Sequence, residues 1–235
     1  MFAIGDIILY LVVHSGSRNL GLQVCNIYQQ RAKNAHEGEV PKDLEYLDGT
    51  LKDDYVHDMK LAQQFAVANR EEMVKHICGK GQLDVEWSFH TVHNYLGDDN
   101  VIRKGAISAK AGEVVYIPLN MRDGGVIAVG KGNSDWNNSA PHGAGRLMSR
   151  AKARDILSVD EFKQQMTEAN IWSSSVCEGT IDEAPGAYKP VEEILSVIGD
   201  TVDIVNTVKP VYNAKAVDSV RRRNRRKEST DVPVL

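Results

Sequence analysis

The sequence has few cysteines and no long apolar run. Cys25, Cys78 and Cys177 are widely separated and form no CxxC pair. The sequence therefore predicts neither a disulfide framework nor a thiolate zinc site, and we expect all three to be buried small apolar residues. The longest apolar run, residues 7–13, is too short to cross a bilayer, and no signal-peptide pattern opens the chain. A cytoplasmic protein without a membrane partner is the resulting expectation.

The common nucleotide-binding and hydrolase signatures are also missing. The sequence contains no GxxxxGKS loop, no GxGxxG between a strand and a helix, and no GxSxG elbow. It has no internal repeat, heptad pattern or Ser/Gly linker, so nothing divides the chain into modules. We treat residues 1–217 as one core, a partial domain, and residues 218–235 as a tail.

Positive charge is concentrated in that tail. The net charge of the whole chain is −4, yet five arginines and one lysine fall within residues 221–227. Such a run can neutralise RNA phosphates, and it is equally typical of a solvated, disordered end. Both interpretations of the tail stay open.

Hydrophobic patterning predicts an α+β fold, with mixed or antiparallel sheets flanked by helices. The sheets come from short β-prone runs that alternate with Gly, Asn and Asp turns between residues 84 and 129. Ser158 and Glu161 form a capping-box pattern that marks a helix start. The expected helices are 22–33, 53–77 closed by Gly79, 162–169 and 191–198. The expected strands are 7–13, which would be central, then VEWSF, VIRKGAIS, EVVYIPL, VIAVG and finally 201–214.

Three short clusters place a histidine among Gly, Ser, Asn or Arg: HSGSR at 14–18, HTVHN at 90–94 and APHGAGR at 140–146. A neutral imidazole can bind a transition metal, and it is a nucleophile toward phosphorus when a neighbour fixes its tautomer. Taken singly, His14 or His93 is more typical of a hydrogen-bonded structural residue than of a metal ligand.

The glycines around His142 are more informative. GKGN at 130–133 and HGAGR at 142–146 let the backbone approach a ligand closely and present N–H groups to an anion. Arg146 adds a planar fork of donors suited to phosphate. These segments predict a nucleotide or phosphate site, with tight turns as the alternative.

In order and spacing, the motifs HSGSRNLG, HNYLG, RKGA, IPLNMRDG, GKGN, SAPHGAGRLMSR, DEAPGAYK and YNAKA resemble the RtcB family over residues 7–217. The resemblance implies a ligase that joins an RNA 3′-phosphate, or a 2′,3′-cyclic phosphate after hydrolysis, to a 5′-hydroxyl. It also implies GTP and manganese (Mn2+) as cofactors.

The resemblance assigns roles to particular residues. His142 would attack the α-phosphate of GTP and hold GMP as a phosphoramidate, and His14 and His93 would be manganese ligands. Asp123 would read the guanine edge, unless its loop is only a surface turn. The full set that the resemblance places at the nucleotide is Asn94, Asn120, Asp123, Gly143, Ala144, Gly145, Arg146, Tyr188 and Lys215.

The sequence departs from the family pattern in one large respect. The family's DxxCGM and GNHFxE segments, which supply further metal ligands and nucleotide contacts, are absent, and neither Cys25 nor Cys78 stands beside an acid that would make it a substitute. With only His14 and His93, a dinuclear manganese site would lack the rest of its ligands. We therefore expect activity to need a separate N-terminal polypeptide. The alternatives are a catalytically incomplete RNA- or nucleotide-binding protein and, less favoured, a metal-dependent phosphoesterase.

Overall fold

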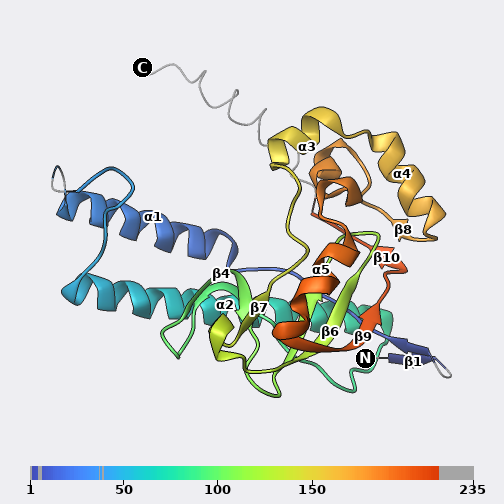
Figure 1. Ribbon diagram of the computed structural model, residues 1–235, viewed down its shortest axis with the longest axis horizontal. Helices are drawn as coiled ribbons and strands as arrows, with labels where there is room; N and C mark the ends of the chain where they lie inside the picture. The colour runs from blue at the N-terminus through green and yellow to red at the C-terminus, as the bar shows by residue number, and fades with distance from the viewer. Residues whose placement is uncertain (1, 5–6, 37, 39, 217–235) are drawn as a thin grey trace. The chain divides into compact units, whose positions relative to one another are not determined.

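The computed structural model describes residues 2–4, 7–36, 38 and 40–216, and it shows an α+β protein (Figure 1). The chain divides into two compact units, an N-terminal unit of residues 1–90 and a C-terminal unit of residues 91–235. Sequence patterns alone mark no boundary at this point. The tail predicted for residues 218–235 lies outside the described residues.

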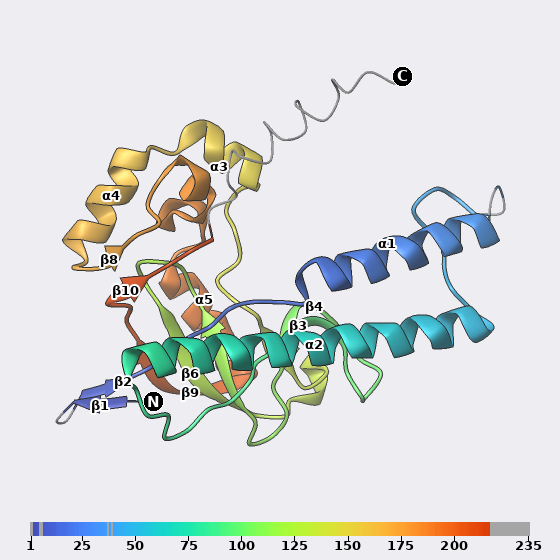
Figure 2. The ribbon, with the colours of Figure 1, turned by 180° about the vertical axis from the view of Figure 1, so that it is seen from behind.

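The N-terminal unit consists of a strand pair and a helical hairpin. Strands β1 (Phe2–Ile4) and β2 (Ile7–Leu9) are antiparallel, and helices α1 (Arg18–Ala35) and α2 (Gly49–Gly81) lie side by side (Figure 2). On α1, Tyr28 is buried, and its hydroxyl donates to the Asp58 carboxylate at 2.7 Å. This contact between a buried ring and a carboxylate fixes one helix against the other.

Three expectations for this unit need correction. The strand predicted over residues 7–13 ends at Leu9 and, within the described residues, pairs with β1 alone, so it is not central. Gly79 does not end α2, which continues to Gly81, because it is Gln82 that takes the left-handed conformation closing the helix, with φ of 50°. Of the three cysteines, only Cys78 is buried, because Cys25 lies on the exposed face of α1 and Cys177 is half-buried.

The C-terminal unit contains two three-stranded antiparallel sheets. Their spatial orders are β3-β4-β7 and β5-β6-β9. The strands are β3 (His93–Leu96), β4 (Ile102–Ser108), β7 (Ser139–Pro141), β5 (Val114–Pro118), β6 (Gly125–Gly130) and β9 (Val202–Val208). A short parallel pair joins β8 (Trp172–Ser173) to β10 (Tyr212–Asn213).

The three longer β-prone runs of the sequence do form β4, β5 and β6, but VEWSF does not form a strand. Residues 85–89 alternate apolar and polar side chains, yet no described strand pairs with them, and Trp87 remains 45% exposed. Alternation alone does not make a strand, because the backbone N–H and C=O groups also need a partner strand. The strand predicted over residues 201–214 is divided into β9 and β10 around Pro210, which has no N–H to donate.

Strand β6 is the centre of the core because it is flanked on both sides and buried over nearly its whole length. Alternate residues of β5, Val115 and Ile117, point into the same core, and Ile194 of helix α5 (Val191–Val197) packs against it. Val191 follows Pro190, as predicted for that helix start. The 3₁₀ segments are η1 (Ser134–Trp136), η2 (Glu178–Glu183), η3 (Pro185–Ala187) and η4 (Ile198–Asp200).

Two capped helices complete the unit. Helix α3 (Arg150–Ile156) begins after Ser149, whose hydroxyl accepts from the Lys152 amide at 3.2 Å. Helix α4 (Val159–Glu168) begins after Ser158, whose hydroxyl accepts from the Glu161 amide, as the capping-box pattern predicts. Among the described residues, none of these helices combines the length and the apolar character that a membrane span requires.

Candidate functional site

His142 is held by the backbone of a neighbouring strand. It follows β7, whose last residue, Pro141, pairs with Ala106 of β4. This register brings His142 to Gly105, where its amide donates to the Gly105 carbonyl at 3.3 Å and its ring Nδ1 lies 2.7 Å from the same oxygen. A carbonyl oxygen only accepts, so Nδ1 must carry the ring proton. In the neutral ring this is the tautomer with its lone pair on Nε2, which a nucleophilic histidine needs.

His93 and Asn94 meet His142 at the same place. The His93 and His142 rings have centroids 4.9 Å apart. Asn94, at a register shift of β3 and with φ of 57°, accepts the Gly105 amide through its side-chain oxygen at 3.1 Å. Gly105 thus binds Asn94 through its N–H and His142 through its C=O, and three residues predicted from two separate motifs form one cluster.

Replacing Gly105 by alanine tests this arrangement. Gly105 has φ of 69°, and a Cβ there would lie 3.8 Å from the His142 ring, an ordinary contact. Alanine at this position should therefore lower the free energy of unfolding by about 1 kcal/mol, because its Cβ disfavours the left-handed backbone conformation. Urea denaturation measures this change. Gly199→Ala is the matched control, because φ there is not positive and nothing lies within 4 Å of the added carbon. Equal stabilities of the two variants would contradict this account.

The segment after His142 packs closely on the end of β5. A Cβ on Gly143 would lie 3.0 Å from the Pro118 carbonyl oxygen, and the Ala144 amide donates to that oxygen at 3.2 Å. Gly145 has φ of 71°, and its carbonyl accepts from the Lys189 amide. Of the three amides predicted to face a phosphate, the Ala144 amide is therefore already occupied. Within the described part of the chain, the Gly143 and Gly145 amides have no backbone acceptor.

Arg146, Tyr188 and Lys215 converge on Glu183. The Arg146 guanidinium lies over the Tyr188 ring, 4.9 Å from its centroid, and donates to the Tyr188 hydroxyl at 3.1 Å. That hydroxyl donates to the Glu183 carboxylate at 2.7 Å, and the Lys215 ammonium lies 3.4 Å from the same carboxylate. The short antiparallel bridge between Arg146 and Tyr188 holds the two segments together.

Charge and burial fix the protonation states in this cluster. Burial by itself would raise the pKa of Glu183, but the Tyr188 hydrogen bond and the positive charges of Lys215 and Arg150 outweigh it and hold that pKa below its usual value. Burial and the Glu183 carboxylate raise the pKa of Tyr188. Glu183 is therefore ionised at neutral pH, and Tyr188 keeps its proton.

Sequence reasoning assigned no role to Glu183, Asp182 or Arg150, although all three stand within quoted motifs. The Asp182 side chain is 3% exposed and pairs with Arg150 and Arg154 of α3. Arg150 also pairs with Glu183. Four cations, including Arg146 and Lys215, thus surround two carboxylates. This leaves an excess of positive charge that suits a phosphate.

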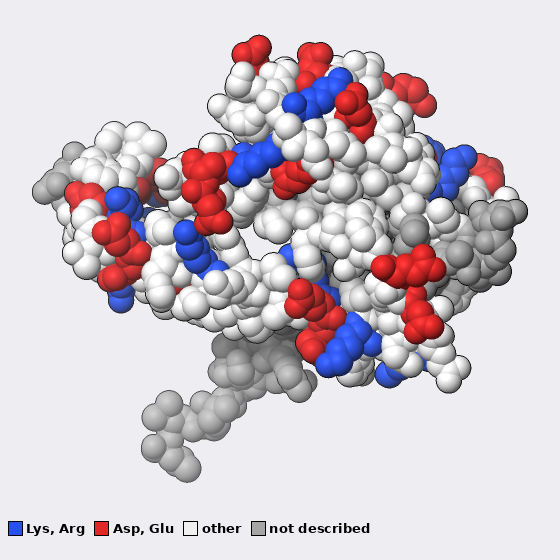
Figure 3. Space-filling model, turned by 90° about the horizontal axis from the view of Figure 1, so that it is seen from below, with Lys and Arg blue, Asp and Glu red and all other residues white. Residues whose placement is uncertain are grey.

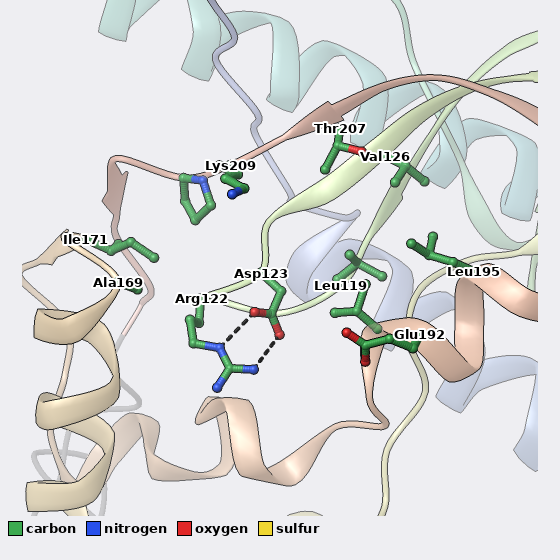
Figure 4. Close-up of a pocket in the computed structure, with 12 residues that line it drawn as sticks. Leu119, Arg122, Asp123, Val126, Ala169, Ile171, Glu192, Leu195, Thr207 and Lys209 are labelled. Carbon is green, nitrogen blue, oxygen red and sulfur yellow. Dashed lines mark hydrogen bonds and ion pairs between the residues drawn. The ribbon is translucent and has the colours of Figure 1, made fainter.

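The polar side chains of the loop between β5 and β6 hydrogen-bond to one another. The Asn120 side-chain oxygen accepts the amides of Arg122 and Asp123, both at 2.9 Å, while its Nδ2 donates to the Asp123 carboxylate at 2.7 Å. Arg122 forms a two-pronged pair with that carboxylate (Figure 4). Burial would raise the pKa of Asp123, but these hydrogen bonds keep it below its usual value. The Asp123 carboxylate is thus paired within its own turn, and its contact with a guanine edge stays a prediction.

His14 belongs to the N-terminal unit, where α2 fixes its loop. Asn69 donates to the Ser15 hydroxyl at 3.0 Å, and Arg70 donates to the Ser15 carbonyl at 3.0 Å. Over residues 2–4, 7–36, 38 and 40–216, no three His, Cys, Asp or Glu side chains gather in a way that could hold a metal ion. The donors within those described residues therefore do not make up a complete manganese site.

The comparisons with known proteins agree with the motifs. The family model described as "tRNA-splicing ligase RtcB" matches residues 2–216 and so covers both units. The chain is 31% identical to the RNA-splicing ligase RtcB of Escherichia coli K12, over 88% of this chain and 56% of that protein. It is 29% identical to the tRNA-splicing ligase RtcB of Nanoarchaeum equitans, over 80% of this chain and 47% of that protein. The chain thus spans about half the length of these curated relatives, and it belongs to the RtcB family.

Proposed function

We propose that this chain carries the guanylyl-accepting half of a GTP-dependent RNA ligase. The observation that supports this most directly is the contact between His142 Nδ1 and the Gly105 carbonyl, because in the neutral ring it makes Nε2 the nitrogen with the free lone pair. Among the described residues, the neighbouring Gly143 and Gly145 amides have no backbone acceptor. Membership in the RtcB family supports RNA as the substrate class.

In the first step, Nε2 of His142 attacks the α-phosphorus of GTP. A bond forms between nitrogen and phosphorus, the bond from that phosphorus to the bridging oxygen breaks, and pyrophosphate leaves with the bond electrons. The Gly105 carbonyl keeps the Nδ1 proton in place and stabilises the positive charge that develops on the ring. The excess cations around Glu183, Arg150 among them, are suited to hold phosphate oxygens nearby.

Two transfers complete the reaction. An oxygen of the RNA 3′-phosphate attacks the phosphorus of the His142-bound GMP, which breaks the nitrogen–phosphorus bond and places GMP on the RNA end. The 5′-hydroxyl of the second RNA then attacks the original 3′-phosphate. A phosphodiester forms, GMP leaves, and the hydroxyl proton is released. Each transfer is a displacement at phosphorus in which positioning and charge provide most of the rate.

We propose that a separate N-terminal polypeptide completes the chain and that manganese binds only when that polypeptide adds ligands. His93 lies beside His142, and His14 is presented by the loop fixed to α2, so this chain would supply two of the ligands. Imidazole alone binds manganese weakly, which is why carboxylate or thiolate donors from the second polypeptide would be required.

The test uses GTP labelled at the α-phosphate, incubated with the purified chain in the presence and absence of an N-terminal RtcB polypeptide and manganese. We expect an acid-labile label on this chain, mapped to His142 by mass spectrometry. GTP labelled at the γ-phosphate is the control and should leave no label, because pyrophosphate departs. Absence of label under every condition would overturn the proposal.

A second candidate function is binding of RNA ends or nucleotide without chemistry. The four cations around Asp182 and Glu183 favour it, because they would attract phosphate whether or not His142 reacts. In that case RNA affinity should be unchanged by His142→Ala and should fall as salt concentration rises.

A further inference from the structure

The strand pair β8–β10 presents two stacked aromatic rings to solvent. Trp172 and Tyr212 are register partners, with ring centroids 4.9 Å apart and planes inclined by only 22°. Trp172 is 67% exposed and Tyr212 48% exposed. The strand register places the two side chains next to each other, but rings of this size usually bury most of their surface, and these two stay largely open to water. We call Trp172 and Tyr212 the stacking platform.

Hydrogen bonds hold the stacking platform in place. The Trp172 amide donates to the Val211 carbonyl at 3.1 Å, and the Tyr212 hydroxyl lies 3.1 Å from the Ser174 hydroxyl. Asn213, next along β10, donates to the Met121 carbonyl at 2.7 Å. A ring pair fixed in this way loses little conformational freedom when a third flat group stacks on it.

The strand pair that carries the platform is tied to one feature already described and leads along the chain to another. Met121, to which β10 is tied, belongs to the loop of Asn120 and Asp123, and two residues beyond Asn213 the chain reaches Lys215, which contacts Glu183. On its other side the chain leads back to a pocket of about 380 Å³ through Lys209 and Pro210, and Ile171, next to Trp172, also lines this pocket (Figure 4).

Lys209 stands three residues before Tyr212 and lines the same pocket as Ile171. Arg122, the other cation lining the pocket, is paired with Asp123, whereas exposed Lys209 has no ion pair within the part of the chain that the structure describes. An ammonium group on a flexible stem is suited to a phosphate on a mobile strand. The platform and Lys209 together thus offer the two contacts that an unpaired nucleotide requires, one for the base and one for the phosphate.

The surroundings favour a nucleotide over a protein surface as the occupant. Ser173 and Asn213, the other residues of the strand pair, are polar, and Val211, which precedes β10, is an exposed large apolar residue. On the face seen in Figure 3, acidic and basic side chains are interspersed, without a continuous basic stretch among the described residues. Stacking of bases on exposed aromatic rings contributes binding energy that does not depend on a continuous basic surface.

We infer that the stacking platform binds one unpaired base of an RNA strand, with Lys209 contacting a phosphate of that strand. The choice of RNA as the ligand class rests on the proposed function. The platform would extend the site beyond the residues that handle GTP and would favour RNA ends that are single-stranded.

The test measures the dissociation constant of the full chain for a fluorescently labelled single-stranded oligoadenylate by anisotropy, over a series of salt concentrations. Trp172→Ala should weaken binding by about tenfold and leave the salt dependence unchanged, because it removes a stacking contact and no phosphate contact. Trp172→Tyr should bind within about threefold of the unchanged chain, because a ring remains. Lys209→Ala should instead reduce the salt slope by about 0.7.

Trp136→Ala is the matched control, since Trp136 is also exposed, at 55%, but lies on η1 away from the strand pair in sequence. Equal weakening by Trp136→Ala and Trp172→Ala would overturn the inference. The inference would also be overturned if Trp172→Ala bound RNA as tightly as the unchanged chain but self-associated less in sedimentation. That result would assign the rings to a contact between protein chains.

A labelling assay on the same preparations separates this inference from the proposed function. His142 labelling without any dependence of RNA binding on Trp172 would overturn the platform and leave the ligase proposal intact. RNA binding that depends on Trp172, in a chain that takes no label under any condition, would support the platform and overturn the ligase proposal.

Discussion

Replacing His142 by alanine should abolish labelling of the protein by α-labelled GTP, a loss of at least about a thousandfold. The proposed reaction passes through a bond to the Nε2 atom of this ring, and alanine offers no atom that can form it. The measurement is the initial rate of acid-labile label incorporation under the condition in which the unchanged chain is labelled.

Two controls make this result specific. His76→Ala removes an exposed histidine of α2 that the proposed site does not include, so labelling should be unchanged. The structure should also tolerate His142→Ala, because among the described residues the side chain makes one hydrogen bond, to the Gly105 carbonyl, worth about 1 kcal/mol. Label on a correctly folded His142→Ala chain would contradict the assignment of the nucleophile.

Replacing Asp99 by alanine should destabilise the protein by about 3 kcal/mol, measured as the free energy of unfolding in urea. Arg103 is only 2% exposed, and its guanidinium forms a two-pronged pair with the Asp99 carboxylate at 3.1 and 2.9 Å. Without Asp99, a buried positive charge would lose its counter-charge. Arg103 also donates to Ser139 in β7, the strand that leads to His142, so the loss should weaken the support of the candidate site.

A second substitution should partly reverse this effect. In the double variant Asp99→Ala, Arg103→Met the buried charge is gone, so stability should recover by about 1 kcal/mol or more relative to Asp99→Ala alone. Asp135→Ala, an exposed carboxylate that forms no ion pair among the described residues, is the control and should change stability by less than about 0.5 kcal/mol. No recovery in the double variant would show that lost packing, rather than the buried charge, causes the effect.

The same pair predicts how stability depends on pH. Hydrogen bonds from Arg103 hold the pKa of Asp99 well below its ordinary value in the folded protein. A carboxyl group with a depressed pKa stabilises the fold above its unfolded pKa of about 4, and this contribution is lost as pH falls toward the folded value. We therefore expect unfolding free energy to fall below about pH 4, and to fall less steeply in the double variant.

Sequence patterns were most informative where structure is local. Helices α4 and α5 begin where Ser158 and Pro190 predict, and the β-prone runs of β4, β5 and β6 contain enough β-branched residues, as in VIAVG, to predict strands. The patterns failed where pairing decided the outcome. VEWSF has the alternation of a strand but no partner, and HNYL, which does form β3, is too short and too interrupted by left-handed Asn94 to be recognised.

The sequence by itself determined which residue types are present for chemistry, in which order, and to which family they belong. It did not determine which of them meet. Only the pairing of β7 with β4 brings Gly105 to His142, and only the folded segments around Arg146 and Tyr188 make Glu183 a common partner. The physical reason is that contacts between residues 37 or 42 positions apart depend on strand register and burial, which the whole unit sets and no short motif encodes.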